Sequence, residues 1–600
     1  MPELFFKGKE FVHNHHLSVP FRPLLPKPEL SVGDVRLDGN LIVHGDNLFA
    51  LKALLPAYSG GVDCIFIDPP YNTGTTDKWA YNDNVSGPMF EEWLASSPVS
   101  IEDGLRHDKW CAMMYPRLKL MHELLSDRGS IWITLDDNEV HHCRAMLDEI
   151  FGENSIIAQI AWQKRTSREN RATMSPSFDH VIAYSKDLAD TWRLYRNLLE
   201  PSEDGYSNPD SDPRGDWKSI PFTAQGFRRN QVYEITSPSG TVFLPPRGRC
   251  WAMVESEFER LKSLDKIYWP REGEGRPRVK QFPHEAKGLV PDTLWLSSEV
   301  GDTEESKKLL MEIFPERADL NFHAPKPYQL VQRIVAIATS KDSVVLDSFA
   351  GTGTTAHSVL KQNAKDEGRR RFILVEQEDY AESLTAERVR RVITGYPFRG
   401  TYKEELYSAN ITLAKARGFA AVEAEADAEV LFELTRFDGA TKALKAGVFS
   451  IDGTKEVDST SVGLAGTFTY CELGQPIVLD DLLRGDSLPE SLALGSLLFH
   501  TATNQAFDAS VATTTGALSF LGESRGTYVW LVYKPELEFL RSADAALTMT
   551  LAKQIAAHNP SARHVVFAAA RFVSQRLLNE AKVPVEFAPL PWSLYRVQRS

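Results

Sequence analysis

The sequence is poor in cysteine, with five in 600 residues. They stand far apart, and no two form a Cys-x-x-Cys pair of the kind that holds zinc. The odd number also argues against a disulfide framework of the kind found in small secreted proteins. We therefore expect reduced, packed thiols, a cytoplasmic location and no metal centre. The cysteines are Cys64, Cys111, Cys143, Cys250 and Cys471.

Long hydrophobic runs are also lacking. No uncharged apolar stretch reaches the roughly 18 residues that a membrane-spanning helix needs. His, Asn and Pro interrupt residues 1–22, so no signal peptide is recognised there. Positive charge is in deficit, because 67 Lys and Arg face 81 Asp and Glu, a net charge of −14. This balance excludes a protein that coats nucleic acid over its whole surface. Hydrophobic residues make up 42% of the chain, which predicts folded domains.

Two regions of the chain alternate between short apolar stretches and helical periodicity. This alternation predicts an α/β fold with a largely parallel sheet. The region 321–400 shows the same alternation of strands and helices as the region 39–154, so we expect both regions to build one sheet. Predicted strands are 41–43, 62–67, 130–135, 343–346 and 371–375, and predicted helices are 47–55, 109–125, 138–151, 328–339, 354–362 and 380–393.

The stretch between these regions loses the pattern and interleaves Pro, Gly, Arg and aromatic residues, which predicts an inserted irregular domain. A linker is expected near 395–405, followed by a C-terminal α/β or α+β domain with strands 528–533 and 563–568 and helices 547–558 and 572–581. We therefore divide the chain into an arm (1–38), a first half (39–154), an insertion (155–320), a second half (321–400) and a C-terminal domain (401–600).

The motif Asp68-Pro69-Pro70-Tyr71-Asn72-Thr73-Gly74 directly follows a predicted buried strand. Ligands of parallel sheets bind beyond the carboxyl ends of the strands. The two prolines stiffen the backbone and remove two N–H donors, leaving carbonyls to accept. A carboxylate, these carbonyls and a Tyr ring suit a planar group with an exocyclic amine. The alternative is a proline-rich turn that merely ends the strand.

A second motif, Asp347-Ser348-Phe349-Ala350-Gly351-Thr352-Gly353-Thr354-Thr355, also joins a strand to a helix. It is neither a P-loop nor a good dinucleotide fingerprint. Glu376 ends the next strand, where an acid can hold a ribose diol. A nucleoside ligand without phosphate fits both features, and S-adenosylmethionine is such a ligand. An ordinary glycine-rich turn is the alternative.

The turn His44-Gly45-Asp46-Asn47 precedes a predicted helix. Asp46 can accept from an adenine amine, or it can cap the helix N-terminus, and both roles can coexist.

Together the two motifs resemble the β-class amino-methyltransferases of DNA, in which the catalytic motif precedes the cofactor motif. Residues 110–125, 129–139, 146–154, 162–164 and 322–327 are similar to the modification (Mod) subunits of Type III restriction–modification systems. The resemblance covers about residues 40–395. It implies a Rossmann-like, S-adenosylmethionine-dependent methyltransferase sheet with permuted motif order, split by a target-recognition insertion.

The resemblance also implies roles for single residues. Asp68 and the Pro69 carbonyl would accept from N6 of a flipped-out adenine, Pro70 would stiffen the motif, and Tyr71 would stack on the base. The residues implied for the cofactor are Asp347, Phe349, Gly351, Gly353 and Thr354 along its binding loop, Glu376 at the ribose, Asp46 at the adenine amine and Lys326 near the methionine end. Lys326 can equally be a solvated lysine at a helix start.

The insertion is the expected site of contact with double-stranded DNA. Arginines can read guanine edges, while lysines mostly position phosphates. Interleaved aromatic residues can be wedges or core, and many of the charges will simply be solvated. The candidate DNA-binding residues are Lys164, Arg165, Arg168, Arg171, Arg228 and Arg229.

Three alternatives to adenine methylation stay open. Cytosine-N4 methylation uses similar chemistry, although Asp before Pro-Pro-Tyr favours adenine in the family. The chain can also be a DNA-recognition scaffold for a partner ATPase or nuclease. Methylation of RNA or of protein glutamine is disfavoured by the basic, aromatic insertion. The resemblance suggests a homodimer, and the acidic C-terminal domain suggests docking of a restriction, ATPase-helicase or other defence subunit.

Overall fold

The computed structural model describes residues 3–73, 104–169, 172–201, 205–286, 288–317, 325–411, 418–445, 448–476, 488–503, 505 and 507–590. The chain forms two compact units. Unit 1 joins Met1–Arg196 to Asp292–Ser600, and unit 2 is Asn197–Pro291. Within the described residues, no helix is long and apolar enough to cross a membrane.

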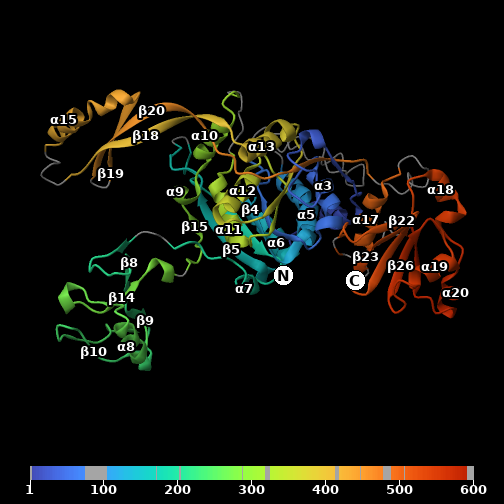
Figure 1. Ribbon diagram of the computed structural model, residues 1–600, viewed down its shortest axis with the longest axis horizontal. Helices are drawn as coiled ribbons and strands as arrows, with labels where there is room; N and C mark the ends of the chain where they lie inside the picture. The colour runs from blue at the N-terminus through green and yellow to red at the C-terminus, as the bar shows by residue number, and fades with distance from the viewer. Residues whose placement is uncertain are drawn as a thin grey trace. The chain divides into compact units, whose positions relative to one another are not determined.

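A ten-stranded sheet organises unit 1 (Figure 1). Its inner strands β2, β17, β16, β3 and β4 are all parallel, although they come from the two separated regions of the chain. The prediction that both regions build one α/β sheet is therefore confirmed. The strand order is β1 (Leu24–Pro26), β21 (Thr469–Leu473), β2 (Leu41–His44), β17 (Arg371–Glu376), β16 (Val344–Asp347), β3 (Val62–Ile67), β4 (Leu125–Leu135), β6 (Phe178–Ser185), β5 (Ile156–Gln163) and β15 (Leu294–Trp295).

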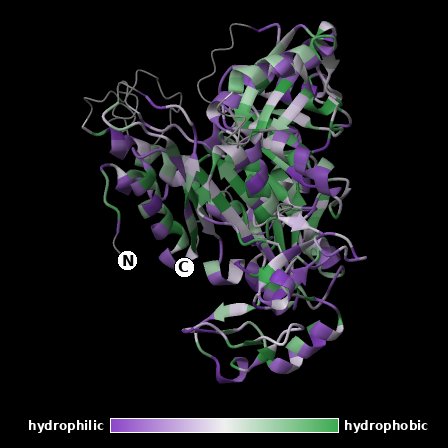
Figure 2. Cartoon of the chain, turned by 90° about the vertical axis from the view of Figure 1, so that its left-hand side faces the viewer, coloured by the Kyte–Doolittle hydropathy of each residue, from purple (hydrophilic) through white to green (hydrophobic). Residues whose placement is uncertain are grey.

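Helices cover both faces of this sheet. On one face, α3 (Asn47–Tyr58), α5 (Arg106–Leu124) and α6 (Val140–Phe151) pack in sequence order on alternate strand residues such as Ile131 and Ile133. On the other face, α11 (Tyr328–Ala338) and α12 (Thr354–Asp366) lie side by side against β3, β4 and β17 (Figure 1). Because both faces are buried, the strands are almost continuously apolar, as Figure 2 shows for the central strands.

Two predicted boundaries are wrong, and both errors have the same cause. Residues 156–163 and 178–185 were assigned to the insertion, but they form β5 and β6 of the large sheet, so the separate unit begins only at Asn197. The expected linker at 395–405 is instead part of β18 (Pro397–Asn410). These strands pair antiparallel with distant partners, and sequence periodicity does not reveal such pairing.

In its described residues, unit 2 is built from short strands, one α-helix and three 3-10 turns around a small aromatic core. That core contains the buried Phe222, Trp251 and Phe258. Trp217 is buried as well, whereas the Phe227 side chain is 75% exposed. The elements are a four-stranded sheet of β13 (Ile267–Tyr268), β14 (Arg278–Gln281), β8 (Trp217–Pro221) and β7 (Tyr206–Ser207), the pairs β9 (Thr223–Gln225) with β12 (Arg249–Trp251) and β10 (Ile235–Thr236) with β11 (Val242–Phe243), and helix α8 (Glu255–Ser263).

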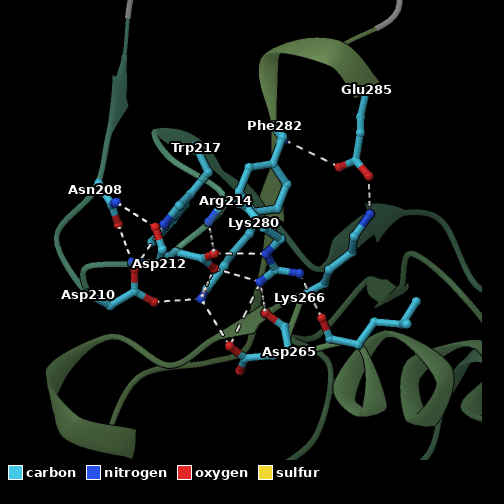
Figure 3. Close-up of polar contacts among 11 residues, drawn as sticks. Asn208, Asp210, Asp212, Arg214, Trp217, Asp265, Lys266, Lys280, Phe282 and Glu285 are labelled. Carbon is cyan, nitrogen blue, oxygen red and sulfur yellow. Dashed lines mark hydrogen bonds and ion pairs between the residues drawn. The ribbon is translucent and has the colours of Figure 1, made fainter.

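A charged network ties the strands of unit 2 together (Figure 3). The buried Asp212 carboxylate accepts from Arg214 Nη2 at 2.6 Å and from Lys280 Nζ at 2.7 Å. Lys280 also pairs with Asp210 at 2.6 Å. The Arg214 guanidinium holds the pKa of Asp212 well below its usual range, with Lys280 adding to the effect. These cations therefore serve the fold of unit 2.

In the described residues, the C-terminal part of unit 1 contains three further sheets, of which the smallest is the parallel pair β25 (Ala546–Leu547) with β27 (Ala570–Arg571). A five-stranded mixed sheet confirms the predicted α/β or α+β character, and helices α19 (Met549–Ala556) and α20 (Gln575–Glu580) pack beside it. Its order is β22 (Thr513–Thr515), β23 (Leu518–Ser524), β24 (Thr527–Val532), β26 (Arg563–Ala568) and β28 (Val585–Pro589). A three-stranded sheet joins β18 to β20 (Val448–Thr460) and β19 (Gly439–Lys445), beside α15 (Phe419–Val430).

Candidate functional site

The carboxyl ends of the parallel strands bring the predicted acidic residues to one edge of the sheet. Asp46 follows β2, Glu376 ends β17, Asp347 ends β16 and Asp68 follows β3. Because these four strands are adjacent and parallel, the acids lie in that order along the edge. Two motifs that are almost 280 residues apart in sequence therefore become neighbours.

Asp68 lies between a hydroxyl and an ammonium group. One carboxylate oxygen accepts from Thr134 Oγ1 at 2.6 Å, and the other pairs with Lys326 Nζ at 2.7 Å. The Lys326 ammonium also lies 4.9 Å from the centre of the Tyr71 ring, within cation–π range. The Lys326 side chain is only 9% exposed, so the alternative of a solvated lysine is wrong. Lys326 therefore lies beside the Asp68–Tyr71 motif.

The two prolines of the motif differ in their contacts. The Pro70 carbonyl accepts from Trp110 Nε1 at 2.7 Å, so it does not remain open as the sequence interpretation assumed. Among the described residues, the Pro69 carbonyl has no hydrogen-bond partner. Burial raises the pKa of the Tyr71 hydroxyl well above its ordinary value, and the Asp68 carboxylate adds to the effect. Asp68, the Pro69 carbonyl and the Tyr71 ring thus remain the groups that the sequence predicts to bind a base.

The glycine-rich loop after β16 is held by buried carboxylates. Asp347 accepts from Phe349 N at 3.0 Å and from Thr355 Oγ1 at 2.5 Å. Glu376 accepts from Gly351 N at 2.6 Å. Burial raises the pKa of Asp347 and that of Glu376 to about 7 each. Both acids therefore hold the loop in its conformation through hydrogen bonds within the chain.

Two further residues complete this loop. Gly353 adopts a φ of +79°, which favours glycine, and it begins helix α12. The Thr354 hydroxyl donates to the Lys326 carbonyl at 3.3 Å, which connects the loop to the segment that carries the Asp68 partner. The Ser348 Oγ is buried and has no hydrogen-bond partner among the described residues. A ligand with a polar group can satisfy it.

Asp46 is the N-cap of α3, where it accepts from Leu48 N at 2.8 Å. It also accepts from the fully buried Arg117 at 3.3 Å. The capping role is therefore confirmed, while its contact with an adenine amine stays a prediction. Arg117 also donates to Asn47 Oδ1 at 2.5 Å, and Asn47 Nδ2 donates to the Ser348 carbonyl at 2.8 Å.

Sequence reasoning missed several residues that support the site. Arg388 is buried and donates to Thr352 Oγ1 at 2.6 Å and to Thr354 Oγ1 at 2.8 Å. Hydroxyls and basic residues are common in any sequence, so the available signal was their place in the quoted segments. Asn47 and Thr355 lie in the two turn motifs, Arg117 and Thr134 lie in the similar segments 110–125 and 129–139, and Arg388 lies in none of them. The missed residues are Asn47, Arg117, Thr134, Thr355 and Arg388.

The predicted DNA-binding residues divide between the two units. Lys164 and Arg165 belong to unit 1, where Lys164 pairs with Asp179 at 2.6 Å and Arg165 pairs with Glu169 at 2.9 Å. Arg168 is exposed, and Arg171 lies outside the described residues. Arg228 and Arg229 are exposed and belong to unit 2. Of these residues, only Arg228 and Arg229 lie in the separate unit 2, and the contact of any of them with DNA stays a prediction.

The fold and this edge define an α/β protein whose two site motifs occur in permuted order. A family model described as DNA methylase matches residues 62–387, more than half of the chain. The chain therefore belongs to this DNA methylase family.

Curated relatives agree with this membership. The chain is 33% identical over 384 residues to the Type III restriction-modification enzyme StyLTI Mod subunit of Salmonella typhimurium strain LT2, covering 62% of this chain and 58% of the relative. It is 30% identical over 390 residues to the EcoPI Mod subunit of Escherichia phage P1, covering 57% and 58%. The match thus spans a little over half the length of these relatives.

Solved structures are more distant. The cytosine-N4-specific PvuII DNA methyltransferase matches with a TM-score of 0.32 and 12% identity, covering 60% of this chain and 89% of that chain. M1.HpyAVI matches with a TM-score of 0.25 and 14% identity, covering 58% and 98%.

Proposed function

We propose that this protein is a site-specific DNA methyltransferase that transfers a methyl group from S-adenosylmethionine to adenine N6. We further propose that it is the modification component of a restriction–modification or related phage-defence system. Membership of the DNA methylase family and the similarity to Mod subunits support this proposal. The observation that carries it is the shared edge at which Asp68, Lys326 and Tyr71 meet the loop of Asp347 and Glu376.

The residues of this edge fit S-adenosylmethionine. The loop that would bind the cofactor contains Phe349, Gly351, Gly353 and Thr354. Glu376 and Asp46 lie at strand ends where a ribose and an adenine can bind. The unpartnered Ser348 Oγ offers a further polar contact. The cofactor, when bound, supplies an electrophilic methyl group on a sulfonium.

Asp68 and the Pro69 carbonyl are suited to accept the two N6 hydrogens of an extruded adenine. These hydrogen bonds favour the pyramidal nitrogen that a methyl transfer requires, and Tyr71 can stack on the base. Extrusion costs a few kcal/mol, which stacking and hydrogen bonding must offset. Lys326 and Thr134 orient the Asp68 carboxylate. Alignment of the reacting groups then supplies much of the acceleration.

Asp before Pro-Pro-Tyr favours adenine, while cytosine-N4 remains the second candidate. Both bases carry an exocyclic amine, so the geometry of Asp68 serves either. The test is to express the protein in a methylation-free host and to sequence the genomic DNA for modified bases. N6-methyladenine at one short motif supports the proposal, and N4-methylcytosine would replace it with the second candidate.

Asp68→Ala tests the assigned chemistry directly. We expect it to abolish methyl transfer because N6 loses its acceptor, while DNA affinity stays within about twofold. Retained methylation would refute the role of Asp68. Asp68→Asn, which keeps the size of the side chain, is the matched control for folding.

Unit 2 is the proposed reader of double-stranded DNA. Arg214 and Lys280 serve its internal network, while Arg228, Arg229 and the exposed Phe227 are available to a partner. β9 and β12 pair antiparallel with Gln225 opposite Arg249, so the segment after β9 lies at the same end as the segment before β12. Arg228, Arg229 and Arg247 thereby come to one end of a two-stranded sheet.

A second copy of the chain and a defence subunit are the proposed protein partners, with docking on residues 401–600. The Mod subunits that this chain resembles are named as parts of restriction–modification enzymes. Light scattering of the purified protein, alone and with the products of neighbouring genes, measures both associations. A strictly monomeric protein in both samples would contradict them.

A further inference from the structure

A cluster of two histidines and one glutamate lies beside the catalytic motif. His107 is in the first turn of α5, Glu139 is the N-cap of α6, and His142 is in the first turn of α6. One ligand atom from each residue lies within 4.8 Å of the others. His107 Nδ1 lies 2.7 Å from Glu139 Oε1, and His142 Nδ1 lies 2.8 Å from Glu139 Oε2.

Among the described residues, no Lys or Arg side chain contacts the Glu139 carboxylate directly. The Glu139 side chain is 0% exposed, and in the described part of the chain its carboxylate contacts one amide and two imidazoles. These three contacts offset part of the cost of burying a carboxylate, and a cation in direct contact would offset more of it. The two histidines are partly exposed, at 34% and 24%, so an ion can reach the cluster from solvent.

The cluster is joined to the catalytic motif through Asn72. Its amide Nδ2 donates to Glu139 Oε1 and to the Arg106 carbonyl at 3.2 Å. Asn72 directly follows Tyr71, is 3% exposed and adopts a left-handed φ of +57°. Its Oδ1 is buried without a hydrogen-bond partner among the described residues. The position of this motif residue therefore depends on Glu139.

We propose that His107, Glu139 and His142 bind a divalent transition-metal ion, for which zinc is the natural probe. Two imidazoles and a carboxylate are a common zinc ligand set, with water or another oxygen in the fourth position. The ion would place a positive charge in direct contact with the buried Glu139 carboxylate. By fixing Glu139 it also fixes Asn72, and thus the end of the catalytic motif.

An ion would replace the hydrogen bonds of His107 and His142 to Glu139, and Arg106 must adapt as well. Its Nε donates to His107 Nε2 at 3.1 Å, which requires the proton of this imidazole to be on Nδ1. A metal on Nδ1 moves that proton to Nε2, so Arg106 has to turn away. Arg106 is the first residue of α5 and only partly buried, so its side chain can reach solvent.

The test measures the metal content of the untagged full-length protein, purified without chelator, by inductively coupled plasma mass spectrometry. We expect about one transition-metal ion per chain. His142→Ala should lose it, while His141→Ala should keep it. His141 is the matched control because it is the exposed neighbour of the same type. Equal metal in both variants, or none in the unaltered protein after incubation with zinc, would refute the site.

A second readout separates metal binding from folding. After removal of metal, added zinc should raise the melting temperature of the unaltered protein and of His141→Ala by several degrees, and leave His142→Ala unchanged. A zinc response of His142→Ala equal to that of the control would refute the assignment. Neither measurement uses DNA or cofactor, so failure of this proposal leaves the proposed methyl transfer untouched.

Discussion

Two buried carboxylates, Asp347 and Glu376, lie at the carboxyl ends of the parallel strands and make the stability of the protein depend on pH. Each accepts hydrogen bonds from the loop that it shapes, yet burial dominates and raises the pKa of each to about 7. Desolvation therefore outweighs the hydrogen bonds, and both acids keep their protons to a higher pH than exposed carboxyl groups do. The opposite balance holds at the exposed surface, where paired acids such as Glu316 have a lowered pKa because Arg391 donates to them.

The raised values predict how the stability of the fold depends on pH. An acid with a higher pKa in the folded state keeps its proton longer there than in the unfolded chain, so stability falls as pH rises. For Asp347 this window runs from about 4 to about 7. Asp347→Asn cannot ionise, so its stability relative to the unaltered protein should improve across that window and level off above it. Urea unfolding at several pH values measures this, and a constant difference would contradict the buried, raised state.

At the scale of elements, a strand from the C-terminal region extends the ten-stranded sheet beyond β2, on its lateral side. β21 pairs with β2 on one side and with β1 of the N-terminal arm on the other, and Cys471 at its centre is buried. Three segments that were predicted as separate domains therefore share one sheet. Without β21, the outer backbone N–H and C=O groups of β2 would lack their partner strand, so β21 also protects the lateral side of β2.

Cys471→Pro tests whether β21 is integral to the sheet. Proline removes the N–H of the ladder and should lower the free energy of unfolding of unit 1 by about 1–3 kcal/mol. Cys471→Ala keeps the N–H and is the control, with a smaller loss from reduced packing. Equal stability of the two variants in urea unfolding would show that β21 does not support the sheet.

A second element, helix α13 (Glu387–Thr394), fixes the glycine-rich loop through Arg388. This buried guanidinium contacts the carbonyl and hydroxyl of Thr352 and the hydroxyl of Thr354. Burial lowers its pKa to about 10, so it remains charged at neutral pH.

Arg388→Met keeps much of the side-chain volume but removes these donors. We expect S-adenosylmethionine to bind about tenfold more weakly, since a disordered loop costs roughly 1–2 kcal/mol. Isothermal titration calorimetry measures the affinity. Arg390→Met, on the same helix but partly exposed, is the control, and equal affinities of the two variants would contradict the role of Arg388.

At the scale of the whole molecule, the proposed chemistry and the proposed recognition of DNA belong to different units. The exposed Arg228 and Arg229 belong to unit 2, while the strand ends that carry Asp68 and Asp347 belong to unit 1. A change to the surface of unit 2 should therefore alter DNA binding without altering cofactor binding.

Replacing Arg228 and Arg229 together with Ala tests this division. If both contact phosphates, the slope of log affinity against log salt should fall by about 2, because each contact contributes roughly 0.9. Fluorescence anisotropy with duplex DNA at several salt concentrations measures the slope. Arg576→Ala, a highly exposed arginine of the C-terminal region, should leave the slope unchanged. An unchanged slope in the double variant would remove the pair from the interface.

The sequence alone determined the α/β class, most of the strands and helices of the two halves, and the motifs around Asp68 and Asp347. These are local patterns of hydrophobic periodicity and turn residues, which short segments carry by themselves. Tertiary structure decided which strands are neighbours, and so placed Lys326 on Asp68 rather than in solvent. It also drew β5, β6 and β21 into the large sheet, and assembled His107, Glu139 and His142 around one buried charge. Such arrangements arise from pairing between distant segments and from burial, and neither can be read from residue spacing.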